Sequence, residues 1–167
     1  NINTSDAGTF LVWGKTYGPI PISPTAITAT GVSQAQNYSF DLYVNLTNTG
    51  LVPMYQAAIN LSDDSNSELT YNATSFFCNR ILPQESCIRA FLITVEAATP
   101  SKLISLTTNA TWNNPDATVN TTSNGTNIIV SSNPIINVYE PGINATTPHG
   151  QTTNIGIITI RSEGNAD

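Results

Sequence analysis

The residues able to perform acid–base, nucleophilic or metal chemistry are few and scattered. The chain has one histidine, His149, in a Thr-Pro-His-Gly-Gln sequence typical of a surface loop. No GxSxG, HExxH, P-loop or GxGxxG motif is present. The acidic residues are dispersed, and only Asp63 and Asp64 are adjacent, as in a solvated turn. We therefore expect no enzyme and no catalytic, cofactor-binding or metal-binding residues.

Three weaker features could support binding. The sequence 63–68 has oxygen ligands at alternate positions, but it lacks the glycine and the final glutamate of an EF-hand loop. Lys15 or Lys102 could form an isopeptide bond with an asparagine, although Lys102 is expected at an exposed strand start. Trp13 and Trp112 could stack on sugars, but Trp112 lies on the apolar side of its segment, which favours core packing.

The two cysteines, Cys78 and Cys87, are separated by eight residues that include Pro83. Zinc binding is not expected, because the pair lacks CxxC spacing and the chain has a single histidine. We predict a disulfide that closes a hairpin in an exported protein. Two free thiols in a cytosolic protein are the alternative.

The composition restricts the possible partners. The chain has 167 residues, which suits one domain, and 40% are hydrophobic, enough for a folded core. Charged residues make up 10%, against about 25% in ordinary soluble proteins. With five basic residues and a net charge of −6, binding to nucleic acid or to an anionic membrane surface is not expected. No apolar run is long enough to span a bilayer. The start at Asn1, without Met or a signal peptide, suggests a processed N-terminus.

Asparagine, threonine and serine supply the polar bulk, with 20, 24 and 15 residues. Asn-x-Ser/Thr sequons occur roughly twice as often as random placement of these residues would give. The predicted glycosylation sites are Asn3, Asn37, Asn45, Asn60, Asn72, Asn109, Asn120, Asn124 and Asn144. Passive accumulation of sequons in an Asn- and Thr-rich chain is the alternative explanation.

Strand alternation places three of these sequons away from the core. The inward side is expected to hold Phe40, Leu42, Val44 and Leu46, then Tyr55, Ala57, Ile59 and Leu61, and then Ile104, Leu106, Thr108, Ala110 and Trp112. Asn45, Asn60 and Asn109 therefore face solvent. We predict an extracellular surface that carries covalent N-glycans and has no other cofactor.

The fold class follows from period-2 patterning and β-branched residues, with no helical period. Strands are expected at 8–17, 25–31, 38–47, 54–61, 68–72, 75–82, 87–97, 103–112, 117–122, 127–131, 135–139 and 153–161. Turns are expected at 48–50, 63–66, 113–116 and Asn124-Gly125. This pattern predicts an all-β protein with an immunoglobulin- or pilin-like antiparallel β-sandwich. The sandwich head would span 25–167, after an N-terminal strand and Pro-rich connector at 1–24.

The N-terminal segment GTFLVWGKTY, residues 8–17, is apolar enough to be a buried strand. It is followed by a connector with prolines at 19, 21 and 24, which stiffen an extended chain. One side of the segment carries Phe10, Val12, Gly14 and Thr16, and the other carries Leu11, Trp13, Lys15 and Tyr17. Spacing leaves two interpretations. The segment is the first strand of its own sandwich, or it is a strand given to a neighbour through main-chain hydrogen bonds.

The start at Asn1, the strand GTFLVWGKTY, the connector 18–24 and the sequon-dense β body together resemble the thread filament subunits of thermoacidophilic archaea. In that family a glycosylated β-sandwich head lacks one strand, which the N-terminal strand of the adjacent subunit supplies, as in chaperone–usher pilins. The resemblance implies a head-to-tail homopolymer on the cell surface that serves adhesion or biofilm formation. Either Phe10, Val12, Gly14 and Thr16 or Leu11, Trp13 and Tyr17 would then fill the acceptor groove.

Other functions remain as alternatives. The main one is a surface-layer or cell-surface immunoglobulin-like glycoprotein module that exchanges no strand. A sugar-binding module would need an exposed aromatic platform. A secreted hydrolase would need acid–base residues that the chain lacks.

Overall fold

The computed structural model describes residues 18–139, 146, 148–152 and 157–165. The expected donor strand at 8–17 and the sequons at Asn3 and Asn144 lie outside this part. Among the described residues, no helix is long and apolar enough to cross a membrane.

The described chain forms eleven strands, which confirms the all-β prediction. They are β1 (Ile22–Ser23), β2 (Ala26–Ala29), β3 (Tyr38–Thr47), β4 (Met54–Asp63), β5 (Leu69–Tyr71), β6 (Ser75–Ile81), β7 (Ser86–Val95), β8 (Lys102–Asn113), β9 (Val119–Val130), β10 (Ile136–Tyr139) and β11 (Thr159–Ser162).

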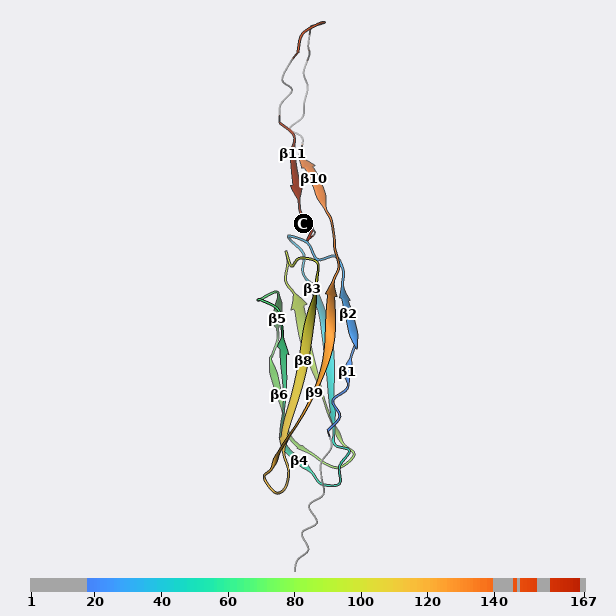
Figure 1. The fold of residues 1–167 in the computed structure, drawn as a ribbon, viewed down its shortest axis with the longest axis vertical. Helices are drawn as coiled ribbons and strands as arrows, with labels where there is room; N and C mark the ends of the chain where they lie inside the picture. The colour runs from blue at the N-terminus through green and yellow to red at the C-terminus, as the bar shows by residue number, and fades with distance from the viewer. Residues whose placement is uncertain (1–17, 140–145, 147, 153–156, 166–167) are drawn as a thin grey trace, which may run out of the picture.

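Two sheets form an elongated β-sandwich (Figure 1). One sheet has the order β1-β3-β7-β5, and the other has the order β2-β9-β8-β4-β6. The strands are antiparallel except for β2, which runs parallel to β9. The chain crosses from one sheet to the other between its first two strands. β1 pairs with β3, whereas β2, after Pro24, pairs with β9. The connector is therefore part of the sandwich, and Ile20 and Ile22 are buried in the core.

Alternation along β8 shows how the core is built. Ile104, Leu106, Thr108, Ala110 and Trp112 are all buried, as predicted. β8 pairs over its full length with β9 and along most of its length with β4, so it lies at the centre of its sheet. The facing sheet contributes Leu42, Val44, Leu46, Phe91 and Ile93. A sandwich core formed by the inward sides of two sheets follows.

Two sequence expectations are wrong. Asn124-Gly125 is not a turn: both residues lie within β9, where they pair with Thr108 and Thr107 of β8. Tyr55 does not point inward, because a bulge interrupts the β4–β8 register between Tyr55 and Ala58. Bulges place an extra residue in one strand and reverse the side-chain alternation. Tyr55 is therefore exposed, and Met54 is buried in its place.

A third sheet, of two strands, extends beyond one end of the sandwich (Figure 1). We call this antiparallel pair, β10 and β11, the ribbon. An isolated bridge between Ser33 and Gly164 ties its base to the sandwich. A Cβ atom on Gly164 would lie 1.9 Å from the carbonyl oxygen of Asn133. The close approach of these two backbone segments therefore requires glycine.

Two leucines of β8, on opposite sides of the sheet, test the register. Leu106 is 1% exposed, whereas Leu103 is 57% exposed. We expect Leu106→Ala to lower the free energy of unfolding by about 2–5 kcal/mol, because it removes buried methyl groups and leaves a cavity. Leu103→Ala should change it by less than about 1 kcal/mol. Denaturant unfolding of both variants measures this, and equal losses would contradict the register.

Candidate functional site

The disulfide between Cys78 and Cys87 is present, as predicted. Cys78 lies on β6, which pairs with β4, and Cys87 lies on β7, which pairs with β3 and β5. Their Cα atoms are 6.5 Å apart, a separation that a disulfide can bridge. The predicted hairpin is wrong, because consecutive strands β6 and β7 belong to different sheets. The bond therefore joins the two layers, and it is consistent with a secreted or extracytoplasmic protein.

Seven of the nine predicted glycosylation sites lie in the described part of the chain. Asn37, Asn60, Asn72, Asn109 and Asn124 are exposed, and Asn45 and Asn120 are partly exposed. Asn60 of β4 and Asn109 of β8 are direct cross-strand partners on the outer side of their sheet. Residues in such pairs have Cβ atoms about 5 Å apart. The side chains of these two sequon asparagines therefore lie next to each other on the same side of the sheet.

Asn124 is arranged differently from the other exposed sequons. Its Nδ2 atom donates a hydrogen bond of 3.0 Å to the carbonyl oxygen of Ile20. An N-linked sugar would replace only one of the two amide hydrogens, so this contact leaves one for attachment. The bond also ties β9 to the chain just before β1.

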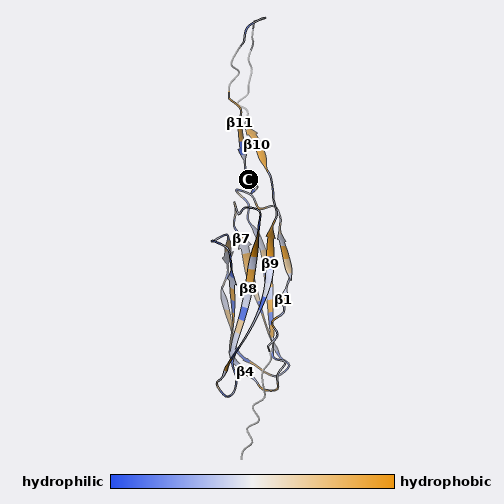
Figure 2. Cartoon of the chain, in the orientation of Figure 1, coloured by the Kyte–Doolittle hydropathy of each residue, from blue (hydrophilic) through white to orange (hydrophobic). Residues whose placement is uncertain are grey.

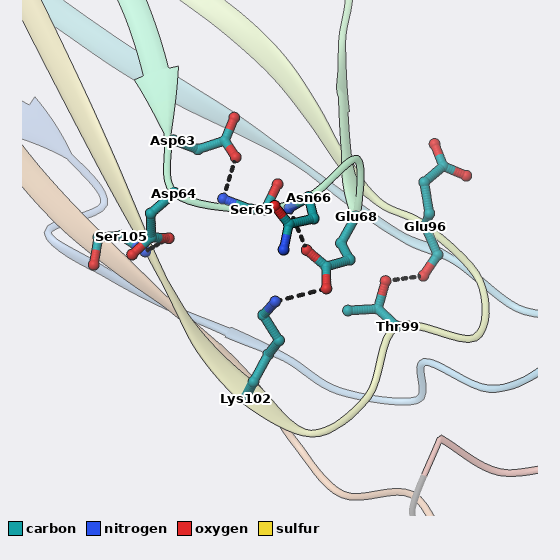
Figure 3. A network of polar contacts seen from close by, with 9 residues as sticks. All are labelled: Asp63, Asp64, Ser65, Asn66, Glu68, Glu96, Thr99, Lys102 and Ser105. Carbon is teal, nitrogen blue, oxygen red and sulfur yellow. Dashed lines mark hydrogen bonds and ion pairs between the residues drawn. The ribbon is translucent and has the colours of Figure 1, made fainter.

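A cluster of carboxylates lies at one end of the sandwich (Figure 3). Asp63 accepts a hydrogen bond from the Ser65 amide, and Asp64 accepts one from the Ser105 amide. Glu68 accepts from Lys102 Nζ at 2.6 Å, and this hydrogen bond lowers the pKa of Glu68. The turn thus uses its carboxylates to hold backbone amides and one lysine. Among the described residues, no group of His, Cys, Asp and Glu could hold a metal ion.

The other residues considered for chemistry lie apart. His149 is an exposed turn residue, and Trp112 is 3% exposed within the core. The core packing favoured for Trp112 is therefore confirmed, and its ring, covered by the sandwich, does not form a sugar-stacking surface. Trp13 and Lys15 lie outside the described residues.

The two ends of the sandwich differ. At one end the chain enters at Gly18, where an added Cβ atom would lie 2.7 Å from Cη2 of Trp112. Trp112 is near the end of β8, and Lys102, at its start, pairs with Val130 at the other end. Trp112 and Lys102 are ten residues apart along β8, which corresponds to about 33 Å. The ribbon continues from Val130, so Gly18 and the ribbon lie at opposite ends (Figure 1).

The first two strands leave parts of both sheets unpaired. β1 pairs with β3 only at Tyr43 and Val44, and β2 pairs with β9 only at 127–130. On that side, residues 38–42 of β3 and 119–126 of β9 have no strand partner among the described residues. Such edges carry main-chain groups to which another strand can add. Sequence patterning did not indicate these unpaired edges, because they depend on where the chain crosses from one sheet to the other, between β1 and β2.

No protein-family model and no curated protein matches the chain. A solved fragment of native alpha-2-macroglobulin from Escherichia coli, from domain MG7 to the C-terminus, is similar with a TM-score of 0.50 and 12% identity over 81% of this chain and 20% of that chain. WR4, an MSP family member of C. elegans, has a TM-score of 0.45 and 10% identity over 69% of this chain and 100% of that chain. The periplasmic chaperone SfaE has a TM-score of 0.46 and 9% identity over 67% and 57%. The chain thus spans about a fifth of the macroglobulin fragment, and this similarity is one of fold alone.

The disulfide makes a prediction about stability. The double variant Cys78→Ala/Cys87→Ala should lower the free energy of unfolding by about 3 kcal/mol, the chain-entropy value for a loop of about ten residues. Denaturant unfolding under non-reducing conditions measures the loss. A reducing agent should destabilise the wild type by a similar amount and leave the variant unchanged. A wild type that is insensitive to reduction would contradict a disulfide that stabilises the fold.

Proposed function

We propose that this chain is the structural subunit of an extracellular, N-glycosylated filament. Identical subunits polymerise head to tail, and each gives its N-terminal strand, residues 8–17, to the next. The filament serves adhesion or biofilm formation. No enzymatic step is part of this function.

The observation that carries the proposal is the buried core that the described strands form between two sheets whose edges are partly unpaired. Both sheets are built from strands between Ile22 and Val130, and their inward residues bury one another. We propose that the largely apolar segment 8–17, which precedes the connector, binds to another molecule. Burying four or five of its side chains would contribute roughly 1.5–3 kcal/mol each. A joint of that strength suits a permanent polymer.

The position of the connector supports a polymer that does not close. The chain enters at one end of an elongated sandwich, and main-chain edges and the ribbon lie elsewhere on the molecule. A contact between two different surfaces is heterologous, and repeating it builds an open chain of subunits. A two-fold dimer would need one surface to pair with itself.

The surface supports an exposed, glycosylated location. Lys102–Glu68 is the one ion pair among the described residues, and amide and hydroxyl side chains dominate the outer sides of the strands. Such a surface stays hydrated without relying on carboxylates that become protonated in acid. The exposed sequons lie on several strands and loops, so glycans would cover much of the body.

Truncation tests the filament. The wild type should form thin filaments that survive boiling in detergent, as seen by negative-stain electron microscopy. A chain lacking residues 1–17 should form none, because it has no strand to give. A chain lacking residues 1–7 is the matched control, and it should polymerise because it keeps the apolar segment.

The opposite results have clear meanings. Filaments formed without residues 1–17 would exclude strand donation. Isolated particles or a two-dimensional lattice of the wild-type protein would favour the alternative, a surface-layer or cell-surface immunoglobulin-like module.

Glycosylation has its own measurement. Peptide mass spectrometry of the native protein should find glycans on exposed sequons, foremost at Asn60, Asn72 and Asn109. Asn60→Gln should remove one glycan mass from the intact protein. Asn66→Gln is the control: Asn66 is exposed but lies outside any sequon, so its variant should keep the full glycan mass. Unmodified asparagine at all exposed sequons would show that sequons accumulated passively.

A further inference from the structure

The ribbon has one apolar side that nothing in the described structure covers. Ile136 and Val138 of β10 share this side with Ile160 of β11, the cross-strand partner of Val138. Their exposed fractions are 68%, 52% and 66%. Figure 2 shows β10 coloured as hydrophobic beyond the end of the sandwich. Isolated two-stranded sheets are marginally stable in water, and a third strand or a packed layer is needed.

The other side of the ribbon is satisfied by its own contacts. The Tyr139 hydroxyl donates to Glu163 at 2.5 Å, and Asn137 donates to the same carboxylate. The guanidinium of Arg161 lies over the ring of Tyr139, 5.7 Å from its centroid. The ribbon is therefore amphipathic: its polar side is held by its own contacts, and its apolar side has no partner among the described residues.

The base of the ribbon is fixed to the sandwich. Asn165 is 4% exposed, and its Nδ2 atom donates to the carbonyl oxygen of Ser131. The Nδ2 atom of Asn133 donates to the carbonyl oxygen of Val32, and the amide of Gln34 donates to that of Glu163. These contacts, which are partly buried, hold the base of the ribbon against the sandwich, as a docking surface requires.

We infer that the apolar side of the ribbon is the acceptor for residues 8–17 of a second copy of this chain. The inference rests on the proposed function and deepens it by naming the receiving surface. The incoming segment adds to the ribbon as a third strand, with main-chain hydrogen bonds along its edge. One alternate set of its side chains then lies on the same side as Ile136, Val138 and Ile160, in contact with the apolar residues of the strand that it joins.

Chain length identifies the occupant as a second copy. Ten residues span at most about 36 Å when fully extended. From Gly18, residues 8–17 of the same chain reach only about as far as Lys102, because Trp112 and Lys102 lie ten residues apart on β8. The ribbon begins at Ile136, six residues past the Val130 partner of Lys102. A copy stacked end to end brings its own Gly18 next to the ribbon.

Photo-cross-linking of the full chain tests the acceptor directly. Phe10 and, separately, Trp13 are replaced by p-benzoylphenylalanine, so that both sides of the segment are probed. Isotopically heavy and light proteins are mixed, assembled and irradiated. Heavy–light cross-links from position 10 or 13 into 136–139 or 157–162 are expected. Cross-links only to 38–42 of β3 or 119–126 of β9, only within one chain, or only between two ribbons would overturn the assignment.

Charge substitution supplies a matched pair on β11. Ile160→Asp places a carboxylate on the apolar side and should reduce the assembled fraction at least tenfold. Thr159→Asp adds the same charge on the opposite side, at an exposed position, and should stay within about twofold of wild type. Circular dichroism checks that both variants fold. Equal assembly of the two variants would overturn the assignment.

The two proposals can fail separately. If the chain lacking residues 1–17 still polymerises, strand donation is wrong and the ribbon has no donor. If that truncation abolishes polymerisation but Ile160→Asp polymerises normally, donation stands and the acceptor lies elsewhere.

Discussion

The hydrogen-bonded pairing of β8 with β9, over twelve residues from Lys102–Val130 to Asn113–Val119, is the interaction on which the other features depend. Its register fixes which side chains of both strands enter the core, so it also fixes which ones reach solvent. Asn109 faces outward because Ala110 and Thr108 face inward. The length of the same pairing separates the end where the chain enters from the end that bears the ribbon. Exposure of sequons and polarity of the molecule thus have one structural origin.

The low charge of the chain fits this architecture. Its few carboxylates are used locally, as in the turn after β4, where Asp63, Asp64 and Glu68 hold backbone amides and Lys102. Hydration of the remaining surface depends on amides and hydroxyls, whose solvation does not change with pH in the acidic range. In the part of the chain that the structure describes, Lys102–Glu68 is the single ion pair, so charge pairing contributes little to this surface.

The sequence was sufficient for the fold class, for most strands and for the cysteine pair, because alternation and turn residues are local signals. The inward rows of β3 and β8 were predicted correctly from that alternation. Tyr55 was not, because the bulge in β4 arises from pairing with β8, which is remote in sequence. Asn124-Gly125 has turn composition, yet pairing with Thr107 and Thr108 keeps it extended. The pattern placed two cysteines on adjacent strands but could not show that those strands belong to different sheets.

The parallel pair β2–β9 has a mechanical consequence. β2 is reached from Gly18 at one end, and β9 leads out to the ribbon at the other. A pull between these ends draws the two strands along their length in opposite directions. The hydrogen bonds between the two strands are then loaded in shear, so they resist the force together and do not break one after another. The disulfide carries none of this load, because it closes only the short turn between β6 and β7. Resistance to stretching therefore resides in the two strand pairs that hold the start of the sandwich, β1 with β3 and β2 with β9.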